Sequence, residues 1–267
     1  MSAQKLRTSV ADGVLTITLD DPPANTYSYE MMQEIDDAIL AARMDAAVHV
    51  IVITGAGEKF FCAGANIGML KDADPDFKYY FCLHANETLT RLEQTPKLVI
   101  AALNGHTVGG GLEVALAADI RIARRGAGKI GLPEVALGVL PGTGGTQRLA
   151  RLVGKARAIE LMATGRLMTM DDALPLGIVT EVWGDEELQG RSFNDAVLDY
   201  ARQFTPPAKA SRAVGRMKRA VQSGAEAGML EGLSIERELQ QLLFQSDDAR
   251  EGIAANLEKR KPQFQGK

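Results

Sequence analysis

The sequence has little cysteine, little histidine and no long hydrophobic run, and each shortage narrows what the protein can be. Two cysteines among 267 residues cannot build a disulfide framework, and neither they nor the 3 scattered histidines have the spacing of a metal site. No apolar run approaches the roughly 20 residues that span a bilayer. We therefore expect a cytoplasmic protein with no membrane partner and no metal.

Basic residues are not in excess either. Lys and Arg number 30 against 34 Asp and Glu, which gives a formal net charge of −4. A protein that grips phosphate backbones carries a surplus of positive charge, so we expect no nucleic-acid partner. Hydrophobic residues make up 46% and charged residues 24%, which are the proportions of an ordinary globular chain with one large domain, or one domain and an appendage.

The first two thirds of the sequence predict short strands interleaved with helices. Residues 14–19 (VLTITL) predict a strand, and the apolar runs 48–54 and 98–103 are typical of strands covered on both faces. Ser28 is a suitable N-cap for an amphipathic helix that follows it. This alternation favours an α/β domain.

The last third changes character, because we find no strong strand in it. Helices are expected over 196–204, from Pro206 toward 221, and along the leucine-rich stretch that follows. We divide the chain into an α/β core at 1–200 and a helical C-terminal region at 201–267. Leucine on helices of this kind needs a surface to dock on, either the core of its own chain or another subunit.

Two segments rich in small residues follow predicted strands. In 60–67 (FFCAGANI) the backbone can approach a ligand closely and offer a free N–H, although a tight strand-to-helix connection is an equal alternative. A helix is expected to begin at the three glycines 109–111, where its first N–H groups have no partner within the helix. These N–H groups form a site for developing negative charge, and the charge of Glu113 in the first turn suits the helix dipole. The alternative is that Glu113 is only a carboxylate at a helix start and that the glycines allow close packing.

A second carboxylate, Glu134, follows a short strand expected at 128–131 and has apolar neighbours. It is either exposed on a loop or held in a cleft. The segment 140–146 (LPGTGGT) is rich in glycine but lacks the lysine of a phosphate-binding P-loop. Together, two N–H sites and two carboxylates are what acid–base chemistry beside a thioester carbonyl needs, because the donors stabilise the enolate while the carboxyl pair orients water and delivers a proton.

The order of these motifs resembles the crotonase (enoyl-CoA hydratase/isomerase) family. The similar stretches are 61–67 (FCAGANI), 104–113 (N-G-x-x-x-G-G-G-L-E), 131–149 (G-L-P-E to T-Q-R-L) and 251–264 (EGIAANLEKRKPQF), within a likeness that extends over about 14–264. The resemblance implies a spiral of β-β-α turns with a C-terminal helical region that mediates trimerisation, often as a dimer of trimers.

The same resemblance implies roles for individual residues. The main-chain N–H groups of Ala65 and Gly110 would form an oxyanion hole, Glu113 and Glu134 would hold the reacting water, and Gly142 would line the water site. Asn66 stands where many members carry Asp, which leaves the contact at the adenine side open. The residues implied to contact the substrate or coenzyme A are Ala24, Ala63, Ala65, Asn66, Ile67, Gly110 and Lys259.

The activity that the resemblance implies is the reversible addition of water to a trans-2-enoyl-CoA, in fatty-acid or related acyl-CoA breakdown. The partner would be an acyl-CoA thioester, and no cofactor would be needed. The presence of both glutamates favours hydration, with double-bond isomerisation or another enolate-forming reaction as the alternative. RNA binding occurs in the family but is disfavoured by the net charge, and an inactive scaffold is disfavoured by the glutamate pair.

The wall of the acyl pocket is expected to come from residues 69–80 and 81–92. Bulky side chains there would favour short or medium acyl groups. These side chains are Met69, Leu70, Phe77, Tyr79, Tyr80 and Phe81.

Overall fold

A six-stranded sheet forms the centre of the computed structural model, which describes residues 4–267. The strand order is β1-β2-β3-β5-β7-β9, with β1 antiparallel to β2 and every other pair of neighbours parallel. β3 and β5 are buried along their whole length, as expected for parallel strands covered on both faces. The strands are β1 (Leu6–Ala11), β2 (Val14–Leu19), β3 (Val50–Gly55), β5 (Leu98–Leu103), β7 (Ile120–Arg124) and β9 (Glu181–Trp183).

A second, smaller parallel sheet has the order β4-β6-β8. Its strands are β4 (Phe60–Cys62), β6 (His106–Val108) and β8 (Ile130–Gly131). Each follows the strand of the large sheet that precedes it in the chain and leads on to a helix, so the chain repeats a β-β-α turn three times. The carboxyl ends of all three short strands therefore meet at one edge.

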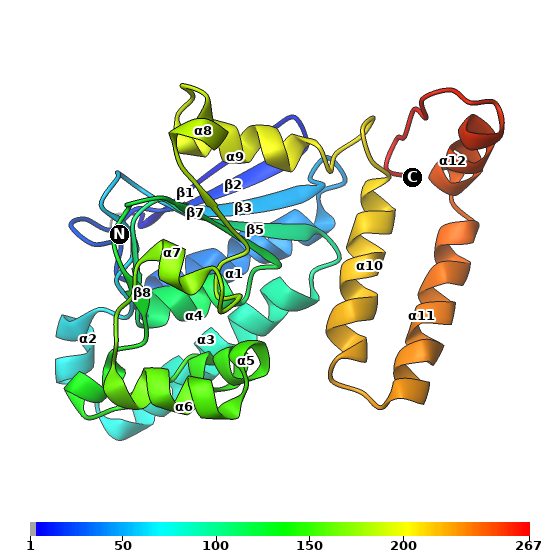
Figure 1. Ribbon diagram of the computed structural model, residues 1–267. Coiled ribbons are helices and arrows are strands. Elements are labelled where there is room, and N and C mark those ends of the chain that lie inside the picture. Colours follow the sequence, from blue (N-terminus) through cyan, green and yellow to red (C-terminus); the bar gives the residue numbers. More distant parts are fainter. Residues whose placement is uncertain (1–3) are drawn as a thin grey trace.

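Helices cover both faces of the large sheet (Figure 1). On one face α9 closes a smaller apolar cluster with β2, β3 and β5, and on the other face α1, α3 and α4 close the main core. The helices of the body are α1 (Tyr29–Met44), α2 (Ile67–Asp72), α3 (Pro75–Gln94), α4 (Gly110–Leu116), the 3₁₀ turn η1 (Glu134–Leu137), α5 (Gly145–Val153), α6 (Lys155–Thr164), α7 (Met170–Ala173), α8 (Asp185–Leu188) and α9 (Phe193–Arg202).

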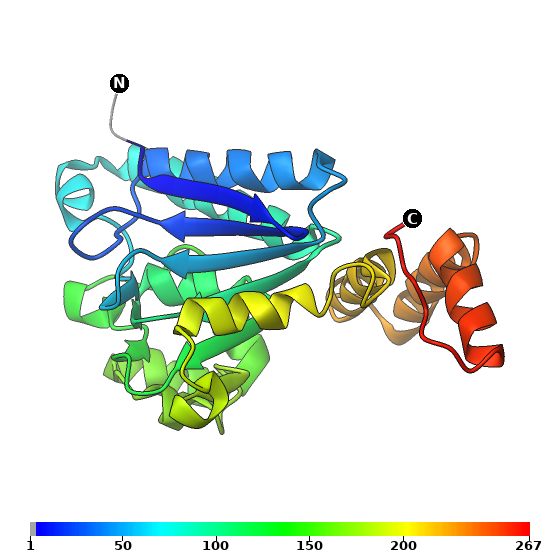
Figure 2. The same cartoon turned by 90° about the horizontal axis from the view of Figure 1, so that it is seen from above.

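Three further helices, α10 (Ser211–Gly224), α11 (Met229–Phe244) and α12 (Asp247–Leu257), stand to one side of this body (Figures 1 and 2). α10 is fixed to the body by the buried Lys218, whose Nζ lies 2.9 Å from an oxygen of Asp119 and donates to the Leu92 and Lys97 carbonyl oxygens. α11 has no buried residue, and its Leu230 and Phe244 are exposed.

The expected α/β class and the mostly helical C-terminal third are confirmed, and β2 and the Ser28-capped α1 lie where the sequence predicts them. The helix expected from Pro206 is wrong in its start, because α10 begins at Ser211. A residue that precedes proline is disfavoured in the helical region, and proline has no N–H to donate. The division of the chain at residue 200 stays a prediction.

Among residues 4–267, no helix combines the length and the apolar character that crossing a membrane requires.

Replacing Gly215 by alanine tests how tightly α10 is docked. A Cβ at this position would lie 1.9 Å from the Pro96 carbonyl oxygen, a backbone atom that cannot move aside cheaply. Alanine is favoured over glycine within a helix by about 1 kcal/mol. The clash outweighs this gain, and we expect a net destabilisation of about 1–3 kcal/mol, measured as a lower midpoint of urea unfolding.

The matched control is Gly224→Ala in the same helix. The nearest atom to a Cβ there is the Gly232 Cα at 3.8 Å, so this variant is expected to keep or raise the midpoint. Equal midpoints for the two variants would contradict the close docking of α10.

Candidate active site

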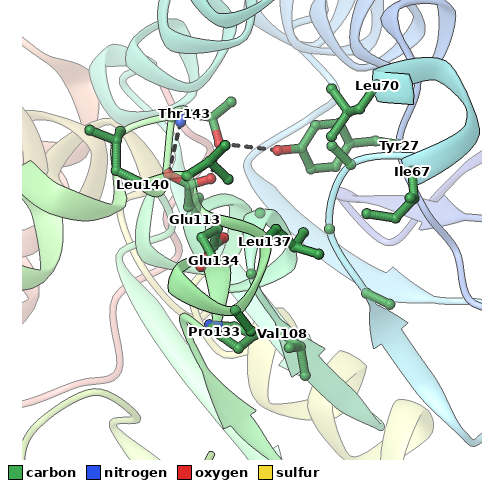
Figure 3. A pocket seen from close by; sticks show the side chains of 18 of the residues that line it. Tyr27, Ile67, Leu70, Val108, Glu113, Pro133, Glu134, Leu137, Leu140 and Thr143 are labelled. Carbon is green, nitrogen blue, oxygen red and sulfur yellow. Dashed lines mark hydrogen bonds between the residues drawn. The ribbon is translucent and has the colours of Figure 1, made fainter. Parts of the chain in front are cut away.

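A cavity of about 270 Å³ opens at the edge where the three short strands end (Figure 3). Most of its lining comes from the segments that follow β4, β6 and β8: 63–67, 109–113 and 133–143. In open parallel sheets ligands bind outside the carboxyl ends of the strands. This cavity is therefore the candidate active site.

Ala65 lines this cavity, and its main-chain N–H has no hydrogen-bond partner in the part of the chain that the structure describes. Tyr27 and Ala65 form a parallel bridge in which the Tyr27 N–H donates to Gly64 O (3.0 Å) and the Asn66 N–H donates to Tyr27 O (2.9 Å). Both bonds use the residues on either side of Ala65, so its own N–H is left out of the ladder. Within residues 4–267 that N–H has no acceptor.

The N–H of Gly110 is left free for a different reason. Gly110 begins α4, where no preceding turn can accept its hydrogen bond, and no other acceptor lies within reach in the described part of the chain. A Cβ built on Gly64 would lie 3.0 Å from the Gly110 nitrogen, so the two amide-bearing segments are in contact. The two free donors therefore lie at neighbouring points of the cavity wall.

The sequence left two explanations for the glycines at the start of α4, namely free N–H groups and close packing, and the structure shows both. Gly109 has φ +58°, which a side chain rarely adopts. A Cβ at Gly110 would lie 2.1 Å from the Tyr27 hydroxyl, and one at Gly111 would lie 2.0 Å from Cys62 O. Close packing and the free amide are therefore products of the same residues.

Glu113 is a buried carboxylate, 2% exposed, that is held from three directions (Figure 3). Its Oε1 accepts from the main-chain N–H of Thr143 (2.8 Å) and of Gly145 (2.7 Å), and its Oε2 accepts from the Thr143 hydroxyl. Gly145 is the first residue of α5, so the carboxylate also meets the positive end of a helix. Its position is thereby fixed.

Glu134 has the opposite environment. It opens η1 and reaches back toward Gly109, where a Cβ would lie 2.9 Å from Oε1, while its buried Oε2 has no hydrogen-bond partner in residues 4–267. Burial, with a smaller contribution from the Glu113 charge, raises the pKa of Glu134 to about 7. Near neutral pH this carboxyl can therefore either give or take a proton.

The remaining wall of the cavity is mainly apolar. Ile67, Leu70, Val108, Leu137 and Leu140 contribute to it (Figure 3). The expected wall of bulky side chains from 69–92 is largely wrong, because Leu70 is the one member of that set in the lining. The other expected side chains lie outside the lining because residues along a helix face different sides. On α3, Tyr79 and Tyr80 are 65% and 64% exposed and Phe81 is buried in the main core, while Met69 on α2 packs against that core.

Most of the residues singled out in the sequence meet at this cavity. The structure places seven of them in its lining: Ala63, Ala65, Ile67, Gly110, Glu113, Glu134 and Gly142. Ala24 lies next to the cavity, where its carbonyl oxygen accepts from the Ala63 N–H, and Asn66 caps α2. Lys259 is exposed after α12, outside the lining. Their roles in binding coenzyme A stay predictions.

Tyr27 and Thr143 are two polar residues of the site that the sequence did not single out for a role. The Tyr27 ring is 1% exposed, and its hydroxyl lies 3.1 Å from the Thr143 Oγ1 (Figure 3). Thr143 lies inside the glycine-rich segment 140–146, and its glycine neighbours are the signal in the sequence that could have drawn attention to it. Tyr27 carried no signal, because it stands at the end of a loop and meets Thr143 only in the folded chain.

The sequence matches the family described as enoyl-CoA hydratase/isomerase over residues 9–267. It is similar to a short-chain-enoyl-CoA hydratase of Clostridium acetobutylicum (36% identity, covering 93% of this chain and 92% of that one). It is also similar to a crotonyl-CoA hydratase of Syntrophomonas wolfei (37% identity, 90% and 89%).

The fold agrees with this similarity. An enoyl-CoA hydratase crystal structure from Bacillus anthracis superimposes with a TM-score of 0.91 at 33% identity, over 99% of this chain and 100% of that one. The expected crotonase-like spiral is thus confirmed. With the motifs, the fold and these similarities in agreement, the chain belongs to the enoyl-CoA hydratase/isomerase family.

Proposed function

We propose that this protein is an enoyl-CoA hydratase, which adds water reversibly to a trans-2-enoyl-CoA and gives a 3-hydroxyacyl-CoA. The observation that carries the proposal is that one mainly apolar cavity brings together two carboxyls and two main-chain N–H groups that have no partner among residues 4–267. The names of the similar proteins agree with it, and 35% identity to a 2,3-dehydroadipyl-CoA hydratase of Escherichia coli adds a third hydratase to them.

The two amides supply the electrostatic part of the reaction. The thioester oxygen would accept from the N–H groups of Ala65 and Gly110, which stabilise it as it gains charge when water adds to Cβ. Removing one donor of this kind in other enzymes costs roughly 3 kcal/mol of transition-state stabilisation. The apolar wall strengthens the effect, because it keeps bulk water away from the developing enolate.

The two carboxyls supply the proton transfers. Glu113 would orient and activate the water, with Gly142 lining the water site, while Glu134 would donate a proton to Cα. The water oxygen forms the bond to Cβ, the π electrons move to the enolate, and the proton lost by water returns to the carboxyl pair. The pair therefore holds the same number of protons before and after turnover, and no cofactor enters these steps.

Further features of the proposal extend beyond the cavity. We propose self-association as a homotrimer or a dimer of trimers, because α11 presents exposed apolar residues such as Leu230 and Phe244 and has no buried residue within the single chain. Sedimentation velocity would distinguish these assemblies. A place in fatty-acid or related acyl-CoA breakdown, a cytoplasmic location and the lack of a nucleic-acid partner stay predictions.

A pair of substrates tests the reaction type. With crotonyl-CoA, a hydratase is expected to remove the near-ultraviolet absorbance of the conjugated enoyl thioester. With a 3-enoyl-CoA, an isomerase would create that absorbance. Gain of absorbance with the second substrate and no loss with the first would favour the alternative, isomerisation. If the absorbance changes with neither substrate, the proposed function is wrong.

Replacing Glu134 by glutamine tests the proton donor. Glutamine keeps the shape of the side chain but cannot give a proton to Cα. We expect a loss of roughly 10²- to 10⁴-fold in the hydration rate, the usual contribution of a general acid or base. Affinity for the saturated butyryl-CoA and the midpoint of thermal unfolding should be unchanged. Near-wild-type turnover in the variant would rule out this role.

The pH dependence of kcat/KM tests the same group. The donor must be protonated, and the pKa of Glu134 is raised to about 7. The protonated fraction falls above that pH, so kcat/KM should decrease by up to about tenfold per pH unit between roughly pH 7 and pH 9. The residual activity of Glu134→Gln should lack this decline. A wild-type profile that stays level over this range contradicts the assignment of Glu134 as donor.

A further inference from the structure

Tyr27 touches all three segments that build the cavity. Its main chain bridges Ala65, its hydroxyl oxygen lies 2.1 Å from the position that a Cβ on Gly110 would take, and the same hydroxyl is 3.1 Å from the Thr143 Oγ1. In Figure 3 its ring points toward Thr143 and Glu113. One side chain therefore connects the segments of both free amides with the loop that holds Glu113.

The number of hydroxyl protons determines which residue donates in each hydrogen bond among Tyr27, Thr143 and Glu113. An ionised Glu113 can only accept, so the single hydroxyl proton of Thr143 is donated to Glu113 Oε2. The Thr143 oxygen can then only accept from Tyr27, which makes the phenol the donor. Burial, helped by the nearby Glu113 charge, raises the pKa of Tyr27 well above its usual value, so the phenol keeps its proton.

The three donors leave Glu113 little capacity to accept further hydrogen bonds. Two carboxylate oxygens accept in about four directions. Thr143 and Gly145 fill both directions of Oε1, and the Thr143 hydroxyl fills one of Oε2. Within residues 4–267 no second donor reaches Oε2, and because Glu113 lines the cavity, a water molecule there could fill the remaining direction. Where that direction points depends on the rotation of the carboxylate, which the Thr143 hydroxyl on Oε2 fixes together with the two main-chain donors on Oε1.

We propose that Tyr27 and Thr143 are positioning residues that act in series, Tyr27 orienting the Thr143 hydroxyl and Thr143 orienting Glu113 toward the reacting water. The inference rests on the proposed hydratase activity and assigns to it Thr143, which hydrogen-bonds Glu113, and Tyr27, which reaches Glu113 only through Thr143. A Tyr27 that served only as core filler would need its ring but not its hydroxyl.

Single-atom changes separate the hydroxyl groups from the packing. Tyr27→Phe removes one oxygen and keeps both main-chain bonds to the Gly64–Asn66 segment. Thr143→Val removes the hydroxyl at nearly constant volume, and Thr143→Ser retains the hydroxyl. Tyr29→Phe is the matched control, because that phenol lies nearby on α1, outside the cavity lining, and its ring packs on Phe77 and His84.

The expected changes are in kcat for crotonyl-CoA, with KM constant within about twofold. Thr143→Val should lower kcat by roughly 10- to 100-fold, the range for a hydrogen bond to a charged group, and Tyr27→Phe by about fivefold, the value for a neutral one. Thr143→Ser and Tyr29→Phe should stay near wild type. The double variant Tyr27→Phe/Thr143→Val should equal Thr143→Val, because Tyr27 acts only through the hydroxyl that is already missing.

Every result that differs from these expectations refutes a specific part of the inference. Wild-type kcat in both Tyr27→Phe and Thr143→Val, from a wild type that hydrates crotonyl-CoA, refutes the inference and leaves the proposed function standing. Losses that multiply in the double variant refute the serial arrangement. A raised KM or a lower unfolding midpoint at unchanged kcat indicates packing alone. If Thr143→Val does not fold, Thr143→Ala takes its place. A wild type without hydratase activity removes the proposed function and this inference together.

Discussion

Two main-chain N–H groups have to stay outside the hydrogen-bond ladders for this site to exist. In a sheet or helix nearly every such group finds a partner, and leaving one unpaired in a buried place costs free energy. Ala65 escapes pairing because the bridge to Tyr27 uses the neighbouring residues, and Gly110 escapes because it begins a helix. The packing of the rest of the fold compensates for the free-energy cost of these two unpaired N–H groups. Because the fold holds both segments firmly, the donors are in place before any ligand arrives.

The second constraint is that two chemically identical side chains must behave differently. Glu113 is surrounded by donors, from Thr143 and from the start of α5, whereas the buried oxygen of Glu134 has none within the described residues. Burial without a donor disfavours the charged form of Glu134, and this raises its pKa to about 7. The proposed division of acid and base between the two carboxyls rests on this contrast of environments.

Glycine makes both constraints compatible with close packing. The first turn of α4 lies against Cys62 and Tyr27 at distances where a Cβ would overlap their atoms. Glycine loses more conformational freedom on folding than other residues. Here that cost is offset because the backbones can approach more closely than any side chain would allow. The same approach places the Tyr27 hydroxyl within hydrogen-bonding distance of Thr143, beside one amide donor and one carboxylate.

The sequence by itself determined the class of the fold and the position of β2 and α1, because strand and helix periodicity is a local feature. The glycine-rich motifs, together with the family resemblance that they carry, named seven of the residues around the cavity. It could not decide which side of α3 faces the ligand, so Tyr79 and Tyr80 were expected in a wall that they do not form. It also gave no role to Tyr27, which meets Thr143 across 116 residues of sequence. Contacts of that separation arise only when the strands align in register, and only the tertiary structure supplies that register.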